Sequence, residues 1–303
     1  MSQDRQSGAV AGFAVRSDVP LAYLRAGGTD PLSVSLGPPD PPPEPTEAPI
    51  REWTPLPENP FHAKLWRAEG RDRLWIEGVG WYSIDPRTGS IEIPADAAAV
   101  PREERLWGIP TSLCIVARGD QTLHAGSIEI GGTAILIGAP GRHGKTTLVT
   151  AFHGAGFRLL SEDTTRCRPA GALAFPGPAM LRVRRDSFER VGVPDAAIVG
   201  EDPDRIHLAI DPARRGPADP LPIAAIVLLR ESDEIRLESL AAELAIPELW
   251  ALAFKLPTDD DRARCFDAVV GLASSVPVWN LHRPLRYDAL EQTIDAVVSL
   301  TAG

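Results

Sequence analysis

The segment AILIGAPGRHGKTT, residues 134–147, constrains the fold of this chain more than any other part of it. It begins with an apolar run that is typical of a buried strand and continues through a loop with three glycines. Lys145 and two threonines then open an apolar stretch that is typical of a helix. A strand, a glycine-rich loop and a helix in this order predict an α/β core.

A loop of this kind is a phosphate-binding P-loop when a strand precedes it and a helix follows it. Backbone N–H groups and the positive end of the helix dipole hold the phosphates of a nucleotide. We expect Lys145 to reach the outer phosphates and the Thr146 hydroxyl to face Mg²⁺. The predicted nucleotide-binding residues are Gly138, Ala139, Gly141, Arg142, His143, Gly144, Lys145, Thr146 and Thr147.

The spacing of the loop differs from the usual pattern. Counting back from Gly144, the first glycine position of the motif holds Ala139 instead of Gly138. Either alanine fills that position or the loop has gained a residue around Arg142 and His143. The competing interpretation is a chance match in a chain that is rich in glycine and alanine, which the flanking strand and helix disfavour.

Composition limits the remaining classes of function. With 303 residues, 44% of them hydrophobic, the chain can form a large domain and a smaller one. A net charge of −10 argues against a general nucleic-acid binder. Three widely spaced cysteines fit neither a disulfide framework nor a zinc site. Without a signal peptide or a spanning apolar run, we expect a cytoplasmic protein that does not bind membranes.

Three regions are predicted along the chain. Residues 1–60 are expected to be flexible, and the proline-rich part at 37–60 is expected to be an extended linker or surface arm. An alternative for that part is a ligand of a proline-binding domain. Residues 61–119 are expected to form a small antiparallel sheet, with strands at 61–66, 73–76, 80–84 and 90–93, and a connecting helix. Residues 120–303 form the predicted α/β domain.

The third region alternates between strand and helix patterns. Strands are predicted at 121–130, 133–138, 157–161, 163–168, 179–183, 223–229, 234–238 and 277–281. Helices are predicted at 145–155, 185–191, 239–255, 259–274 and 287–301.

Two acidic residues, Glu162 and Asp163, follow the strand predicted after the P-loop helix. Ligands and catalytic groups of α/β proteins gather at the carboxyl ends of strands, so a metal ligand or a base is expected here. The alternative is a solvated turn. His124 lies on the strand before the P-loop strand, where a histidine is more often structural than catalytic.

The order and spacing of these segments resemble HPr kinase/phosphorylase and its kinase-like relatives. His124 lies 21 residues before Lys145, and Asp163 lies 18 residues after it. The segment GFRLLSED, residues 156–163, resembles the family segment that follows the P-loop. The resemblance covers about residues 61–303 and is strongest over 121–165.

The resemblance implies an HPr kinase C-terminal domain-like P-loop core that transfers phosphate from ATP, with Mg²⁺, to a hydroxyl group. The acceptor would be a serine of a peptide or protein, or a small hydroxyl-bearing molecule. Some relatives phosphorylate the C-terminal serine of a lasso-peptide precursor, and many are homo-oligomers. It further implies that Lys145 holds phosphates, that Thr146 and Glu162 bind Mg²⁺, that Asp163 is the catalytic base, and that His124 supports the charge.

Some positions differ from the family pattern. The paired aspartates of the family are Glu162 and Asp163 here, and a second metal carboxylate is not recognisable in residues 181–191. Asp186 or Glu189 are candidates for that role. Two other functions are therefore kept beside the kinase: an ATP-binding regulatory or partner protein with little catalysis, and a plain NTPase.

Overall fold

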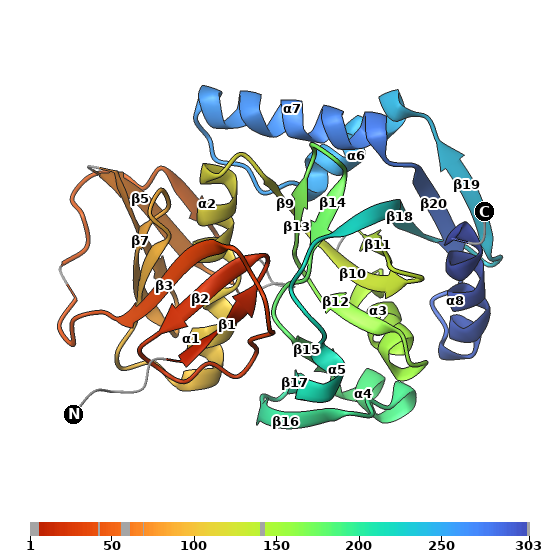
Figure 1. The fold of residues 1–303 in the computed structure, drawn as a ribbon, viewed down its shortest axis with the longest axis horizontal. Helices are drawn as coiled ribbons and strands as arrows, with labels where there is room; N and C mark the ends of the chain where they lie inside the picture. Colours follow the sequence, from red (N-terminus) through yellow and green to blue (C-terminus); the bar gives the residue numbers. More distant parts are fainter. Residues whose placement is uncertain (1–5, 42, 56–60, 69, 140–142, 302–303) are drawn as a thin grey trace.

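A computed structural model describes residues 6–41, 43–55, 61–68, 70–139 and 143–301. In these residues the strands form three sheets with helices packed against them, so the fold is mixed α/β, as predicted. Figure 1 shows the sheet of the N-terminal part at one end of the molecule and the sheet that precedes the glycine-rich loop at the other. Within the described residues, no helix is both long enough and apolar enough to cross a membrane.

The N-terminal sheet has eight strands in the order β1-β2-β3-β8-β7-β6-β5-β4. Neighbours from β4 to β8 pair antiparallel, whereas β3 pairs in parallel with both β2 and β8. The four predicted strands of residues 61–93 are all present. The strands are β1 (Gln6–Val10), β2 (Phe13–Ser17), β3 (Asp30–Leu36), β4 (Arg51–Trp53), β5 (Ala63–Ala68), β6 (Arg71–Ile76), β7 (Gly80–Asp85) and β8 (Ser90–Ile93).

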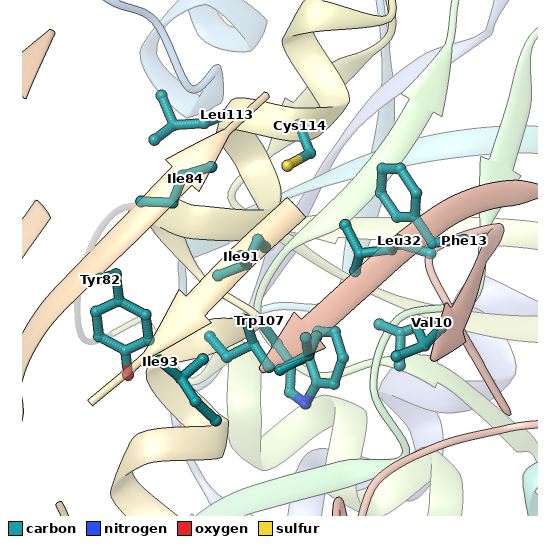
Figure 2. Packing of buried hydrophobic residues seen from close by; sticks show 14 of the residues in the cluster. Val10, Phe13, Leu32, Tyr82, Ile84, Ile91, Ile93, Trp107, Leu113 and Cys114 are labelled. Atoms are coloured by element: carbon teal, nitrogen blue, oxygen red, sulfur yellow. The ribbon is translucent and has the colours of Figure 1, made fainter. Parts of the chain in front are cut away.

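Two short helices close this sheet. The connecting helix predicted from the sequence is in fact two helices, α1 (Ala99–Leu106) and α2 (Ile109–Ala117). Figure 2 shows Trp107, between them, and Leu113 and Cys114 of α2 among the side chains of the sheet. All three residues are buried. Because each large buried apolar side chain contributes about 1.5–3 kcal/mol, this layer fixes α2 against the sheet.

The prediction that residues 1–60 are flexible is wrong for much of this region. Strands β1, β2 and β3 belong to the N-terminal sheet, and Phe13 and Val15 are buried in its core. A tight hairpin joins β1 to β2 through Ala11 and Gly12, both with positive φ angles. These strands are short, and β3 pairs with β8, which lies far along the chain, so the sequence gives little signal of them.

The segment between β2 and β3 also reaches the second sheet. Arg25 is buried, and its guanidinium group donates hydrogen bonds to the carbonyl oxygens of Leu159 and Leu160, both at 3.0 Å. The backbone N–H of Ala179 donates to the carbonyl of Tyr23 at 2.9 Å. The N-terminal part is therefore bonded directly to strands that lead to the candidate site.

The second sheet has nine strands, with the order β12-β10-β11-β18-β14-β13-β9 and with β20 and β19 attached through β18. β11, β18 and β20 run in parallel, so their carboxyl ends lie at one edge. The strands are β9 (Gln121–Leu123), β10 (Ala125–Ile130), β11 (Thr133–Gly138), β12 (Arg158–Ser161), β13 (Thr165–Arg168), β14 (Leu173–Phe175), β18 (Leu221–Glu231), β19 (Arg236–Leu240) and β20 (Val278–Arg283).

Helices cover both faces of this sheet. Ile135 and Ile137 of β11 share one core cluster with Leu148 and Phe152, whereas Leu136 shares another with side chains of the helices near residues 245–273. This alternation follows from the two-residue period of a strand. The helices are α3 (Lys145–Gly154), α4 (Arg185–Val191), α5 (Pro212–Arg215), α6 (Ala242–Leu252), α7 (Asp259–Ser275) and α8 (Leu290–Val298), with 3₁₀ turns at Tyr287–Ala289 and Ser299–Thr301.

A third sheet of β15 (Met180–Arg184), β16 (Ala196–Glu201) and β17 (Arg205–Ile210) lies beside α3 and α4. The strand predicted at 179–183 corresponds to β15, but β14, β16 and β17 were not predicted. The strand predicted at 121–130 is divided at His124, whose backbone N–H donates to the carbonyl of Leu252 at 2.7 Å. This hydrogen bond separates β9 from β10 at residue 124.

Candidate functional site

The glycine-rich loop lies between the end of β11 and the start of α3, as the sequence predicts. Gly144 precedes the helix with φ = 73°, a conformation that glycine adopts at little cost. A Cβ atom at this position would lie 2.4 Å from a guanidinium nitrogen of Arg283. Backbone conformation therefore favours glycine at residue 144, and a larger residue would displace the end of the Arg283 side chain.

Lys145, the first residue of α3, reaches the end of β12. It is 8% exposed, and its ammonium group lies 2.7 Å from Oδ1 of Asp163 and 3.0 Å from the backbone carbonyl of Asp163. Residues 145 and 163 are thus brought together as the sequence predicts. In this structure the lysine is paired with the candidate base.

Thr146 and Glu162 form a second contact between the start of α3 and the end of β12. The Thr146 hydroxyl donates to Oε1 of Glu162 at 2.8 Å. The other carboxylate oxygen of Glu162 is buried and has no hydrogen-bond partner among the described residues. Burial raises the pKa of Glu162, although the positive charge of Arg182 opposes this effect. The site thus contains a buried carboxylate oxygen that accepts no hydrogen bond from the described residues and lies 3.7 Å from Nε of Arg182.

Asp163 lies among three cationic or polar neighbours. Its burial acts to raise its pKa, but Lys145, then His124 and Arg182, outweigh that effect and hold the pKa well below the ordinary value. The Nδ1 atom of His124 lies 3.6 Å from Oδ1 of Asp163. Asp163 is therefore a carboxylate at neutral pH, able to accept a hydrogen bond.

His124 is partly open to solvent. The charge of Asp163 acts to raise its pKa, but desolvation together with Lys145 and Arg182 lowers the pKa below the ordinary value. His124 is therefore a neutral imidazole near pH 7, and it adds a polar group beside Asp163 without adding a positive charge.

Arg182 of β15 helps to balance the charges of the two carboxylates, Glu162 and Asp163. Its Nε atom lies 3.7 Å from Glu162, and a terminal nitrogen lies 3.7 Å from Asp163. Burial acts to lower the pKa of Arg182, but the two carboxylates raise it, so it stays protonated. The group therefore contains two carboxylates facing two cations, Lys145 and Arg182.

The remaining predicted residues lie in different places. The Thr147 hydroxyl lies 3.1 Å from that of Ser187 and faces α4 rather than the carboxylates. Gly138 and Ala139 follow one another at the end of β11, and the carbonyl of His143 accepts a hydrogen bond from Arg283 at 2.9 Å. Gly141 and Arg142 lie outside the described residues.

Neither candidate for a second metal carboxylate takes that position. Asp186 accepts a hydrogen bond from the hydroxyl of Tyr287 at 3.0 Å, and Glu189 is exposed on α4. Across the described ranges, no three His, Cys, Asp or Glu side chains gather in a way that could hold a metal ion.

Comparison with solved structures gives a weak likeness to a kinase/phosphatase. No family model matches the sequence, and no curated protein matches it. The solved structure of the HPr(Ser) kinase/phosphatase from Coxiella burnetii is similar over 60% of this chain and 88% of that chain, with a TM-score of 0.31 and 11% identity. At a TM-score of 0.31, this likeness carries no argument about the function of the chain.

Two arginines of this site were not among the residues predicted to form it. Arg182 of β15 is the first of them. It lies between the buried Leu181 and Val183, and a charge inside such an apolar strand is a signal of an ionic partner. Arg283 ends β20 at the same sheet edge as the glycine-rich loop. A strand pattern alone does not reveal this edge, because strand order comes from tertiary pairing.

Proposed function

We propose that this protein is a kinase that transfers the γ-phosphate of ATP to a hydroxyl group. The observation that carries the proposal is the convergence of Lys145 and Thr146, at the start of α3, with Glu162 and Asp163, at the end of β12. Phosphoryl transfer requires held phosphates, positive charge and a base that orients the attacking group, and these four residues supply such groups.

In the proposed reaction the acceptor hydroxyl oxygen bonds to the γ-phosphorus while the bond to the β–γ bridging oxygen breaks and ADP leaves. Asp163 accepts the hydroxyl proton. Lys145 and the N-terminus of α3 hold the phosphates. Because Lys145 is paired with Asp163 in this structure, phosphate binding would draw the ammonium group away from the carboxylate and free it for the acceptor.

The residues present also fit a magnesium ion. Glu162 has a buried carboxylate oxygen without a hydrogen-bond partner among the described residues, 3.7 Å from Nε of Arg182, and the Thr146 hydroxyl lies beside its other oxygen. Magnesium prefers oxygen ligands and keeps waters and phosphate oxygens in its shell, so few protein ligands are required. Thr146 and Glu162 would hold the ion. When bound, it would neutralise charge on the phosphates.

Substitution of the two central residues tests this proposal. We expect Lys145→Ala to lower kcat/KM for phosphate transfer by at least about 100-fold, since it removes a cation that faces the phosphates. Asp163→Asn should retain ATP binding but lower kcat by about 100-fold or more. The measurements are ATP affinity by calorimetry and the ATP-dependent mass shift of serine-containing peptides and small hydroxyl compounds.

Lys64→Ala and Asp233→Asn serve as matched controls, because they remove the same groups from the N-terminal sheet and from an exposed turn. An Asp163→Asn variant as active as the wild type would show that Asp163 is not the base.

A second function is favoured by one contact. The short Lys145–Asp163 ion pair engages the candidate base, as would suit an ATP-binding regulatory protein with little catalysis. Such a protein would bind ATP and yield no phosphorylated product with any acceptor. A single phosphorylated product would exclude it, and rapid ATP hydrolysis without an acceptor would favour a plain NTPase.

A further inference from the structure

Arg283, the last residue of β20, contacts the loop that leads into α3. It is 3% exposed. One terminal nitrogen donates hydrogen bonds to the carbonyl oxygens of His143, at 2.9 Å, and Gly144, at 3.3 Å. The other donates to the carbonyl of Pro284 at 3.3 Å. A buried guanidinium group therefore holds the backbone just before α3.

The charge of Arg283 is not balanced by a carboxylate. Among the described residues no acidic group lies within ion-pair distance of it, and its buried Nε atom has no hydrogen-bond partner. Arg230, the penultimate residue of the neighbouring strand β18, differs in this respect. It pairs with Glu248 at 2.6 Å and donates to Asn280 at 2.9 Å.

Buried charges are ordinarily paired. Arg25 is also buried without a carboxylate, but its Nε atom donates to the carbonyl of Gly177 at 2.7 Å, whereas the Nε atom of Arg283 has no acceptor among the described residues. Arg283 therefore carries a charge that a nearby anion would balance.

The direction of the contacted peptide groups indicates where that anion would lie. In a trans peptide the N–H points opposite to the C=O. Since Arg283 contacts the C=O groups of His143 and Gly144, the N–H groups of Gly144 and Lys145 point to the opposite side. A cation at the carbonyl end also polarises the peptide and strengthens its N–H as a donor. Arg283 thus favours anion binding at the N–H side.

We propose that Arg283 is a positioning residue for the nucleotide phosphates. It fixes the backbone before α3 and polarises its N–H donors, and the negative charge of a di- or triphosphate balances its own charge across the peptide groups. This inference rests on the proposed kinase function and adds a residue from the far end of the chain to the phosphate site.

The test compares Arg283→Gln and Arg283→Lys with Arg230→Gln, a matched arginine at the same sheet edge that has its own carboxylate. Calorimetry on the full chain measures the affinities for ATP, ADP and adenosine. We expect Arg283→Gln to weaken ATP and ADP binding by about 10–100-fold, since hydrogen bonds to a charged group are of this strength. Adenosine affinity should change less than threefold. Arg283→Lys should recover part of the loss, and Arg230→Gln should stay within about twofold of the wild type.

The outcomes separate this inference from the proposed function. If the wild type binds ATP and transfers phosphate while Arg283→Gln binds ATP equally well, the inference is overturned and the kinase stands. Equal weakening of ADP and adenosine would also overturn it, since that is the result of a merely structural role. If the wild type binds no nucleotide, both this inference and the proposed kinase function are overturned. Should Arg283→Gln fail to fold by circular dichroism, the ADP-to-adenosine affinity ratio of Arg283→Lys decides, and an unchanged ratio overturns the inference.

Discussion

At the residue scale, Arg182 sets the charge state of two carboxyl groups at once. Its guanidinium group lies 3.7 Å from both Glu162 and Asp163. It opposes the rise that burial gives to the pKa of Glu162, and it helps to hold down the pKa of Asp163. Both carboxyl groups therefore depend on Arg182 to remain ionised as the pH falls.

We predict that Arg182→Met moves the acidic limb of the pH–rate profile to higher pH. Without the cation the pKa values of both carboxyl groups rise, so more of each is protonated at a given acidic pH. The loss of kcat/KM relative to the wild type should be about tenfold larger at pH 6 than at pH 8. Arg184→Met, two residues along the same strand and exposed, is the control. A loss that is equal at both pH values would contradict the prediction.

The sequence allowed much of the residue-level site to be predicted, but only where residues are near one another in the chain. Lys145, Thr146, Glu162 and Asp163 lie on consecutive elements, and the structure brings them together as expected. Arg283 escaped prediction because it is 139 residues from Gly144, and only the pairing of β18 with β20 places it there.

At the element scale, α3 combines the candidate site at its first turn with a buried histidine at its last. His153 is 1% exposed. Its burial, reinforced by the nearby charge of Arg214, lowers its pKa below the ordinary value of about 6.5. The helix therefore carries a neutral histidine that resists protonation while the protein is folded.

This helix should make the protein less stable in acid. Between the lowered pKa of folded His153 and its ordinary value, the unfolded chain binds more protons, so the free energy of unfolding falls as the pH drops through this window. We predict that His153→Leu shows a smaller fall in Tm between pH 7.5 and pH 5.5 than the wild type. Scanning calorimetry at the two pH values measures it, and equal falls would show that His153 does not contribute.

Element prediction succeeded where pattern and pairing are local. β11, α3, α4 and the strands of residues 61–93 follow clear apolar periods. β16 (Ala196–Glu201) was not predicted because its residues are exposed or half-buried without a two-residue alternation. The helix predicted at 287–301 is a 3₁₀ turn followed by α8 and a second 3₁₀ turn, a distinction that apolar periodicity does not make.

At the scale of the whole molecule, Arg166 joins the N-terminal sheet to the second sheet. This buried side chain of β13 donates to Asp120 and to Asp30, both at 2.7 Å, and to the carbonyl of Ala11 at 2.8 Å. Its guanidinium carbon lies 4.9 Å from the ring centre of Phe13. The side chain of Arg166 therefore bonds the N-terminal sheet to the second sheet, and the two sheets should unfold together.

We predict that Arg166→Met lowers the free energy of unfolding by about 3 kcal/mol, since removing one partner of a buried ion pair leaves an unbalanced charge. Arg168→Met is the control, because Arg168 binds the same Asp120 from a more exposed position and should cost about 1 kcal/mol or less. Denaturant titration by fluorescence measures both values. Similar losses for the two variants would contradict the prediction.

The hydrogen bonds of Arg25 have a consequence for how the protein is made. Leu159 follows Arg25 by 134 residues, so at ribosomal rates the partner of this side chain is synthesised on the order of 10 s later. Until β12 has been made, the arginine must remain in water, and the segment that carries it cannot take its final position. Strands β1, β2 and β3 are therefore synthesised well before they can become fully packed.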